Sequence, residues 1–530
     1  MGILTWVLGG GAFNLFETYA LHIEFREFIG GPQGLAASVM PALEAMRPLR
    51  WPAERIDTLG GYLTYHNLLL FQGFLAIYAA VQGVHLIRRP ESQGSLEQVL
   101  ATGWSPSAYL RDRLLGLLAT LTIITLGLGA SVAIALAYVG APDTIAAFQS
   151  LLAVGLCSLV GMALGLLCAQ VWRSARTALG VTVITLVALY VGTNEWENLG
   201  WAGALRFLSP FHWANDGRAL VPGVGFNLRS MAVLLAMAMV LLWPARWAFL
   251  QRDYAGALLR ERPPSSRRVE RVRVQRWALS RPWRALLVRH RIALLAWALT
   301  TAAFSVLWMG LAGAVTDSWS MSEFFRSVLG SDLEGSMREL YVSFGCDTLA
   351  AIVVAYSVSQ ASGWVLDLQE GRVETMLSAP LSWPRLVMER LAATLVGVLA
   401  VTASWLLAAQ VMAPVVDVPV DAAGQGRALV LCLGIGGAAA ALAAILTALT
   451  RNAVATSGLI AYVVVAYVLG WFVDILHWPS WLRRLSVFEA FEHPYLEWPS
   501  TTNLVILAAT TVLGATVAAV IAQRTAKVAG

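Results

Sequence analysis

A short acidic motif occurs twice in the sequence. Residues 94–114 read GSLEQVLATGWSPSAYLRDRL and residues 371–391 read GRVETMLSAPLSWPRLVMERL, so six of the 21 aligned positions are identical at an offset of 277. The repeated residues are Gly94, Glu97, Leu100, Ser105, Arg113 and Leu114 in the first copy and Gly371, Glu374, Leu377, Ser382, Arg390 and Leu391 in the second. A carboxylate on a short amphipathic helix is either a solvated charge or an ionic contact to a partner protein. The repetition favours a contact for Glu97 and Glu374.

The residues needed for nucleotide or catalytic chemistry are missing. Lys527 is the only lysine, and it is followed by Val528. A P-loop needs Gly-Lys-Ser/Thr, because the ammonium group must reach the β- and γ-phosphates. The seven histidines form no Ser/His/Asp or metal-ligand pattern. The cysteines lie in or beside apolar runs, without disulfide or zinc spacing, at Cys157, Cys168, Cys346 and Cys432. We therefore expect neither a nucleotide site, a metal nor a cofactor on this chain.

Polar side chains interrupt one apolar run in each half of the chain. Residues 64–87 carry His66, Asn67, Gln72, Gln82 and His85, and residues 347–366 carry Ser357, Ser359 and Gln360. Such groups either form hydrogen bonds between packed membrane helices or line a polar path. Both interpretations remain open. The candidates for a substrate path are Phe74, Tyr78, Gln82, Tyr356 and Gln360.

The elements that must position these residues are membrane helices. The chain is 58% hydrophobic and 13% charged, with a mean hydropathy of +0.66. We count about twelve apolar runs long enough to cross a bilayer. They lie near 3–23, 64–87, 113–138, 145–171, 177–193, 229–250, 291–314, 347–366, 390–413, 426–449, 455–475 and 502–522. Lipid gives the backbone no partner, so each run should be an α-helix. The predicted fold is an all-α polytopic membrane protein.

The two halves of the chain are predicted to be parallel repeats of six helices. A second match, Leu208-Ser209-x-Phe211 against Leu485-Ser486-x-Phe488, has the same offset of 277. An even number of helices separates equivalent points, so both copies run in the same direction, related by a pseudo-two-fold axis along the membrane normal. The expected domains are a first repeat over 1–251, a basic linker over 252–290 and a second repeat over 291–530.

The residues of the second copy of the motif predict a specific local structure. Gly371 can end the preceding helix in a conformation closed to other residues. Val373, Met376 and Leu377 then recur at helical spacing, which predicts a short amphipathic surface helix. A break follows over 379–384, and a new spanning helix starts near Arg385. The pattern Glu370-Gly371-x-x-Glu374-x-x-Leu377-x-Ala379-Pro380-Leu381-Ser382, followed by Glu389-Arg390, resembles the coupling-helix loop of type-2 (ABC-2, or type V exporter-like) ABC transporter permeases.

This resemblance implies a function and a set of partners. In that family the loop docks on an ATPase, so two ABC ATPase subunits on separate chains, holding ATP and Mg, are expected to bind the two loops. The first copy is degenerate, with Gly103 where the second has Pro380. The family also implies a tunnel between the halves, lined by the second and fifth helices and capped near 194–222 and 476–500. Hydrophobic or amphipathic compounds, of the kind moved by actinobacterial antibiotic and multidrug (tetronasin-type) exporters, are the expected substrates.

Two rival functions make different demands on the sequence. An ion-coupled secondary transporter with two six-helix halves needs carboxylates within the membrane, whereas the apolar runs contain almost none. Glu17 and Asp347 are the exceptions, and each is expected near the outer edge of its run, where a snorkelling or loop-edge role is favoured. A membrane enzyme needs an acidic or histidine cluster at an interface, and none can be assembled. The sequence thus favours the permease of an ABC exporter.

The net charge of +5 and pI near 9.1 arise mainly from arginines in short loops. This placement follows the positive-inside rule and does not indicate nucleic-acid binding. It predicts a multi-pass protein of the bacterial cytoplasmic membrane with both termini in the cytoplasm. Segment 267–291 alternates arginine with apolar residues, which indicates either an interfacial helix or a further contact to the ATPase.

Overall fold

The computed structural model is helical throughout the residues that it describes. These are residues 3, 5–27, 31–45, 51–195, 203–251, 281–313, 316, 337–369, 372–377, 381–450, 458–460, 462–463, 465–467, 469–470, 473, 478–491, 493–495 and 498–529. The chain divides into two compact units, Met1–Arg267 and Arg268–Gly530. The division lies inside the linker predicted over 252–290. The finer domain bounds remain a prediction, and each unit is described by itself.

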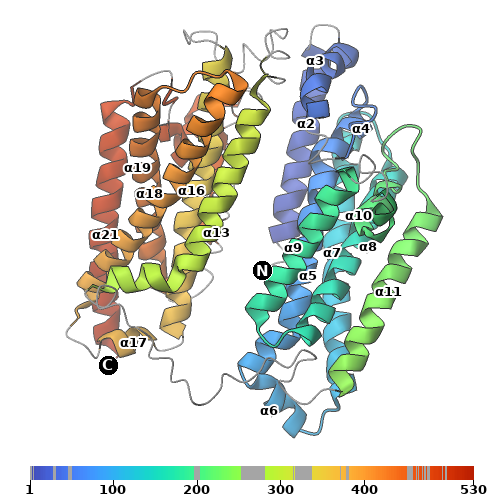
Figure 1. The fold of residues 1–530 in the computed structure, drawn as a ribbon, viewed down its shortest axis with the longest axis horizontal. Helices are drawn as coiled ribbons and strands as arrows, with labels where there is room; N and C mark the ends of the chain where they lie inside the picture. Colours follow the sequence, from blue (N-terminus) through green and yellow to red (C-terminus); the bar gives the residue numbers. More distant parts are fainter. Residues whose placement is uncertain are drawn as a thin grey trace. The chain divides into compact units, whose positions relative to one another are not determined.

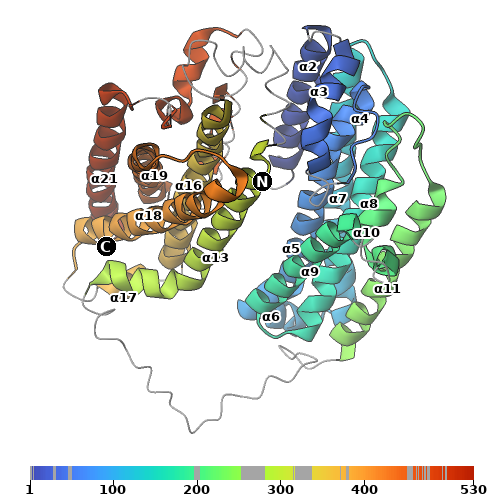
Figure 2. The ribbon, with the colours of Figure 1, turned by 45° about the horizontal axis from the view of Figure 1, so that its top comes forward.

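The first unit is a bundle of long helices with short helices at its ends (Figure 1). A π-helical turn, Thr5–Gly10, leads into α2. The elements are α2 (Gly11–Glu27), α3 (Gly31–Ala45), α4 (Leu59–Leu63), η2 (Thr64–Leu68), α5 (Leu69–Ser92), α6 (Ser95–Ala101), α7 (Pro106–Tyr138), α8 (Thr144–Val171), α9 (Ala175–Glu195), α10 (Pro210–Asn215) and α11 (Leu228–Gln251). The short helix α10 packs against α8, α9 and α11 (Figure 2).

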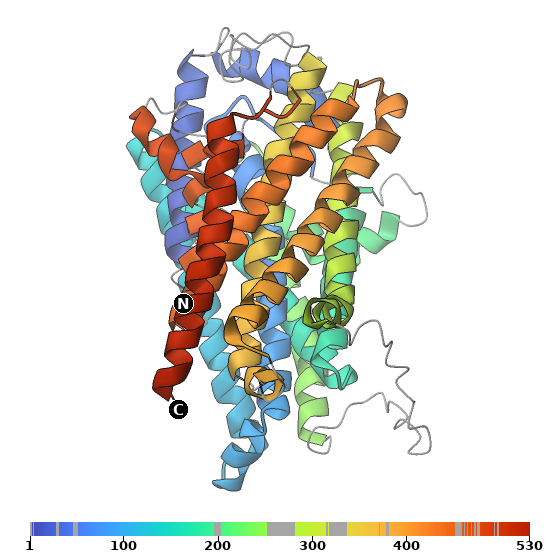
Figure 3. The same ribbon diagram turned by 90° about the vertical axis from the view of Figure 1, so that its left-hand side faces the viewer.

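The second unit repeats this order of elements. They are α13 (Pro282–Gly310), α16 (Met337–Gln369), α17 (Arg372–Leu377), α18 (Trp383–Val416), α19 (Ala422–Thr450), η4 (Ser480–Leu485), η5 (Val487–Phe491) and α21 (Thr501–Ala529). The long helices α16, α18, α19 and α21 run side by side (Figure 3). The first turns of α13 lie across the bundle and the rest runs along it (Figure 1). These turns hold the part of segment 267–291 that the structure describes, from Arg281 onward.

Helix boundaries in the two units follow the offset of 277 found in the motif. The helix before the loop ends at Ser92 in the first unit and at Gln369 in the second, and the loop helix begins at Ser95 and at Arg372. The short helices before the last span keep the same offset, since α10 begins at Pro210 and η5 at Val487. Both units therefore build the same order of elements in the same register.

The described residues contain ten helices long and apolar enough to cross a membrane, and they correspond to ten of the twelve predicted runs. The run 3–23 forms a π-helical turn and the 17-residue α2, which is shorter than these spans. The run 455–475 is only partly described, with a short apolar helix over Gly458–Tyr467. The edge position expected for Asp347 is wrong. Buried Tyr341, Val342 and Cys346 extend α16 back to Met337, which places Asp347 inside the helix.

Glycines bring α5 and α8 into backbone contact in the first unit. A Cβ on Gly165 would lie 2.1 Å from the Ala80 carbonyl oxygen, and one on Gly83 would lie 2.4 Å from that of Met162. Both distances are far below van der Waals contact. The positions that correspond to Gly83 and Gly165 in the second unit are Gln360 and Leu442. Because these residues carry side chains, α16 and α19 cannot approach each other in this way.

We predict that Gly165→Ala destabilises the protein, because the new methyl group must push α5 away from α8. The expected loss is about 1–3 kcal/mol, which a lower melting temperature of the purified full-length chain in detergent would report. The control is Gly180→Ala in α9, where a Cβ would meet nothing within 4 Å. Equal melting temperatures of the two variants would refute this account of the helix contact.

Candidate functional site

The first copy of the motif forms a short helix with one buried and one exposed face. Gly94 has a φ of +70°, the left-handed conformation that lets the chain turn from α5 into α6. Leu96 is buried, and Val99 and Leu100 pack against the same apolar cluster. Glu97 is exposed on the opposite face. The predicted amphipathic surface helix is thus present, with its acidic residue turned to solvent.

The second copy forms the corresponding helix, α17. Val373 is fully buried, while Met376 and Leu377 pack against the apolar cluster of the second unit. These residues correspond in register to Leu96, Val99 and Leu100 of α6. Glu374 lies on the helix, but its side chain, like the whole of Gly371 and Pro380, is outside the described residues. The contact predicted for Glu374 therefore remains a prediction.

A serine begins the next helix in both loops, as the motif suggests. The Ser105 hydroxyl accepts a hydrogen bond from the Ala108 N–H (3.2 Å), which caps α7 and satisfies one of its free donors. Ser382 has the same extended conformation at the start of α18. A proline follows within two positions in each helix, where the missing N–H costs nothing. Ser105 therefore has a structural role in ending its loop, whereas Ser382 makes no side-chain capping hydrogen bond.

The repeated arginines have different surroundings in the two units. Arg113 is exposed and lies over the Tyr109 ring, 5.4 Å from its centroid. Arg390 is largely buried, lies 5.4 Å from the Trp364 ring centroid and donates a hydrogen bond to Asp367 (2.6 Å). Only the second arginine joins the loop to the bundle through an ion pair.

Asp367 is the centre of an ionic cluster that the sequence did not single out. Its carboxylate is 2% exposed and pairs with Arg289 (3.0 Å), Arg372 (3.2 Å) and Arg390 (2.6 Å). These residues come from α13, α17 and α18, so one carboxylate of α16 links four helices. Its position at the loop end of an apolar run, a few residues before the motif, was the only available signal.

The charges of the cluster control the ionisation of Asp367. Burial raises the pKa of the carboxyl group, but the hydrogen bond and charge of Arg390, the charge of Arg289 and the hydrogen bond from Arg372 together outweigh it. The net result is a pKa below the ordinary value of 3.8. Asp367 is thus an anion at neutral pH, and it is paired with three arginines among the described residues.

Glu389 makes a second contact between α13 and the start of α18. Its carboxylate accepts a hydrogen bond from the Trp283 backbone N–H (3.1 Å) in the first turn of α13. A carboxylate at this position also interacts favourably with the helix dipole. Asp112, which corresponds in the first unit, instead pairs with Arg111 (3.2 Å) on the surface. The Glu-Arg pair of the motif therefore anchors α13 and the ionic cluster, whereas the Asp-Arg pair of the first copy does not.

The second repeated motif fastens the short helix before the last span to the fifth helix. Ser209 donates to the Leu189 carbonyl (3.0 Å) and accepts from the Phe211 N–H (3.3 Å). Ser486 likewise donates to the Ala466 carbonyl (2.6 Å) and accepts from the Phe488 N–H (3.2 Å). Each phenylalanine also makes an edge-to-face contact with a tyrosine of the fifth helix, namely Tyr190 and Tyr467. The repeated Leu-Ser-x-Phe motif thus forms the same contact between the short helix and the fifth helix in both units.

One pocket of the first unit contains a predicted path residue. It encloses about 150 Å³ between α5 and α9 and opens to solvent. Its lining is almost wholly apolar and includes Phe74, Ile77, Tyr190 and Phe211. Phe74 is 60% exposed, so its ring is available for contact. Helices two and five of the first unit therefore share an apolar pocket, and the substrate path between the halves remains a prediction.

The other path candidates lie in different surroundings. Tyr78 packs against Trp6 (5.6 Å between ring centroids), and Gln82 is half-buried. Tyr356 is buried and packs against Trp297, 5.9 Å away in α13. Gln360 lines a pocket with residues of α13, α18 and α19. The structure thus does not bring the five candidates together within one unit.

Gln82 and Gln360 do not occupy equivalent positions. The counterpart of Gln82 at an offset of 277 is Ser359, and that of Gln360 is Gly83. One residue turns the side chain by about 100° around an α-helix. Gly83 faces α8, whereas Gln360 lines a pocket with residues of α13, α18 and α19. Their shared residue type therefore does not make them a symmetric pair.

Comparison with protein families finds one match in each half of the chain. Residues 15–254 match the family described as "ABC-2 family transporter protein". Residues 279–524 match the family described as "Multidrug efflux system permease Rv1217c, C-terminal domain". No match was found among curated proteins. The two family matches cover the two structural units almost completely and do not overlap.

We predict that Asp367→Asn destabilises the second unit, because it leaves the buried Arg390 without a carboxylate. Removing one partner of a buried ion pair costs about 3–5 kcal/mol, whereas the exposed Asp112–Arg111 pair contributes about 1 kcal/mol or less. A lower melting temperature than that of the Asp112→Asn control would support the cluster as described.

The pH dependence of this difference is also predicted. The pKa of Asp367 is lower in the folded protein than in the unfolded chain, so pairing stabilises the fold fully above about pH 3.8. The stabilisation is lost as the pH falls through the lowered value. The gap in melting temperature between the wild type and Asp367→Asn should thus be constant near neutrality and shrink only in acid. A gap that closed between pH 5 and 7 would contradict this assignment.

Proposed function

Because the chain is a multi-pass ABC-2 type permease, we propose that it is the membrane subunit of an ATP-driven exporter of hydrophobic or amphipathic compounds. Separate ATPase subunits, one at each repeated loop, supply the energy. They bind the ATP and Mg, since a chain with one lysine beside its C-terminus cannot form a P-loop. The second family match, described by multidrug efflux, supports export of drug-like compounds as the direction and class of transport.

The exposed face of α6 carries the coupling part of the proposal. Leu96 anchors the helix to the bundle, so Glu97 and Gln98 face outward from a fixed element. Trp104, in the same loop, is 48% exposed. Tryptophan is one of the residue types enriched at energetically strong protein contacts, and Glu97 adds a charge to the same loop. The ATPase is proposed to dock here and at α17.

The ionic cluster gives the docking site a mechanical connection to the membrane helices. Arg372 of α17 binds Asp367 of α16, which in turn binds Arg390 of α18 and Arg289 of α13. A displacement of α17 is therefore carried to three long helices through charge-assisted hydrogen bonds. ATP binding is proposed to move both loops and to shift the halves between inward- and outward-facing states, which is alternating access around a site between the repeats.

The proposed path for substrate begins with the α5/α9 pocket. Its apolar lining and the exposed Phe74 ring suit a hydrophobic compound. Tyr78, Gln82, Tyr356 and Gln360 remain candidates from the sequence. The protein is proposed to lie in the bacterial cytoplasmic membrane with both termini in the cytoplasm, and to be of the tetronasin type found in actinobacterial exporters.

We predict that Glu97→Arg weakens co-purification of the partner ATPase, because reversing a charge at the contact introduces repulsion. A loss of about tenfold or more in the amount bound is expected. Glu374→Arg should act in the same way at the second loop. The control is Glu44→Arg, at an exposed position on α3 at the opposite end of the first unit. If both loop variants bound ATPase as well as this control does, the docking assignment would be wrong.

We further predict that Phe74→Ala weakens the response of the assembled complex to substrate. Losing most of a buried aromatic contact should raise the drug concentration for half-maximal stimulation of ATP hydrolysis by about tenfold. Basal hydrolysis should not change, since Phe74 lies near the start of α5 and the first loop follows the other end of that helix. Ile123→Ala serves as the control, because Ile123 is 50% exposed on α7 and lies outside the pocket lining. An identical response of both variants would exclude Phe74 from the path.

A further inference from the structure

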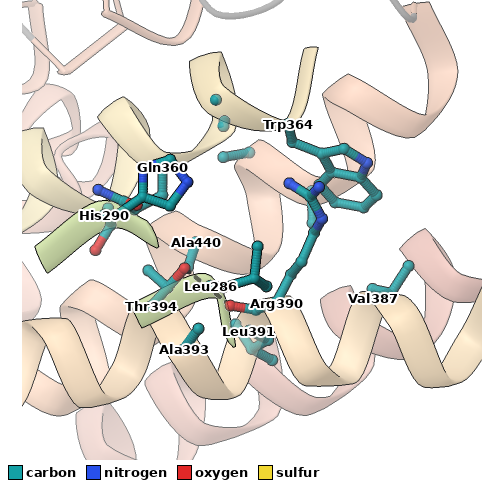
Figure 4. Close-up of a pocket in the computed structure, with 15 residues that line it drawn as sticks. Leu286, His290, Gln360, Trp364, Val387, Arg390, Leu391, Ala393, Thr394 and Ala440 are labelled. Carbon is teal, nitrogen blue, oxygen red and sulfur yellow. Dashed lines mark hydrogen bonds between the residues drawn. The ribbon is translucent and has the colours of Figure 1, made fainter. Parts of the chain in front are cut away.

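The second unit contains a pocket at the loop end of its bundle (Figure 4). It encloses about 50 Å³ and opens to solvent, and residues of α13, α16, α18 and α19 line it. In the close-up, Arg390 and Trp364 lie on one side, and His290 and Gln360 lie on the other. Five alanines and Gly363 contribute much of the remaining surface.

The first unit fills the same place with large apolar side chains. At the offset of 277, Leu86 stands for Gly363, Leu166 for Ala443, and Leu167 for Ala444. These leucines belong to a packed cluster around Val84 and Ile87. The pocket is therefore not required by the fold, because the repeat without it builds the same helices.

The two glycines that join α5 to α8 in the first unit are replaced by larger residues in α16 and α19 of the second unit. In the first unit, Gly83 and Gly165 let α5 and α8 touch through their backbones. Gln360 and Leu442 replace these glycines in the second unit, and Gln360 lines the pocket. The smaller alanines around it leave the pocket unfilled.

Polar groups replace apolar ones in the lining as well. Ser357, Trp364 and Thr394 stand where the first unit has Ala80, Ile87 and Leu117. Ser357 is 1% exposed and Trp364 is 4% exposed. Burying polar groups without partners costs free energy, so their presence at a pocket needs an explanation.

Several of these groups have no hydrogen-bond partner among the described residues. They are the Ser357 hydroxyl, the Trp364 Nε1–H and the Arg390 Nε–H. The two nitrogen groups can only donate, and the hydroxyl can do so. A ligand that satisfied them would have to supply acceptor oxygens.

The charge near the pocket has the matching sign. Arg390 lies at the junction of the pocket and the ionic cluster, where three arginines surround the single carboxylate of Asp367. The guanidinium group binds Asp367 through one terminal nitrogen and leaves its Nε–H for another acceptor. Carboxylate and phosphate oxygens are the acceptors that a guanidinium group binds most strongly.

We propose that this pocket binds an acidic amphiphile, with its carboxylate or phosphate head at Arg390 and its apolar chain against the alanine-lined wall of α18 and α19. The head would accept hydrogen bonds from the unpartnered donors, and the chain would fill the space left by the missing leucines. Such a ligand is either an anionic membrane lipid or an acidic hydrophobic compound. The site needs no ATPase, so it stands or falls separately from the export proposal.

The test is binding of dodecyl phosphate to the purified full-length chain in neutral detergent, measured by titration calorimetry without any ATPase. Arg390→Gln removes the charge, and Gly363→Leu introduces the leucine found in the first unit without replacing a polar residue. Each should weaken binding by about tenfold or more. Inorganic phosphate and dodecanol, which supply the head and the chain alone, should each bind far more weakly than dodecyl phosphate.

Two variants control for effects on the fold. Arg113→Gln changes the corresponding arginine of the first unit, and Gly363→Ala adds a Cβ that would lie 3.8 Å from His290 Cε1, an ordinary contact. Both should bind dodecyl phosphate as the wild type does. If Arg390→Gln does not fold, Gly363→Leu still decides the matter, because it leaves the ionic cluster intact. Unchanged binding in Gly363→Leu, or equal binding of dodecanol and dodecyl phosphate, would overturn the proposal.

A second arm identifies the source of the ligand. The chain is placed in nanodiscs of phosphatidylcholine, with or without phosphatidylglycerol, and titrated with dodecyl phosphate. Loss of probe binding in the presence of phosphatidylglycerol identifies an anionic lipid as the occupant. Retention of binding in both membranes identifies a free acidic amphiphile, and that result supports the site equally.

Discussion

Lipid provides no hydrogen-bonding partners, so each helix that crosses it must satisfy its backbone internally and pack through side chains or through glycine. The chain meets this constraint twice with the same order of elements. Polar chemistry is then concentrated at helix ends. Ser105 begins α7, Ser209 and Ser486 fasten short helices to the fifth span, and Asp367 joins the loop to the bundle.

Equal topology does not produce equal packing in the two units. The first unit closes α5 on α8 through glycine and fills the loop end with leucine, and its repeated arginine lies on the surface. The second unit has larger residues in place of these glycines and buries its arginine against Asp367. The first unit thus has close backbone packing between α5 and α8, and the second unit has an ionic link between its bundle and its loop helix. In this arrangement α17 is the loop helix that is tied to several long helices at once.

The proposed coupling and the proposed ligand pocket meet at Arg390. Its guanidinium group contacts both the carboxylate that holds α17 and the space between α16 and α19. A ligand that competed for this group would alter the charge balance around Asp367. Binding in the pocket and movement of the loop would then share one side chain, which gives a physical route between a membrane compound and the site proposed to dock the ATPase.

The sequence alone determined the helical membrane class, the repeat at an offset of 277 and the amphipathic loop helices, because hydropathy, spacing and internal identity are local properties. Ten of the predicted runs are helices in the structure. The tertiary structure decided what the repeated residues contact. Arg113 and Arg390 occupy identical motif positions, yet only the second meets a buried carboxylate. Likewise, Gln82 and Gln360 were both candidates for a substrate path, but Gln360 aligns with Gly83 and lines a pocket with residues of α13, α18 and α19. Such contacts depend on which faces of distant helices meet. Local sequence patterns do not specify those faces, so only the folded structure shows them.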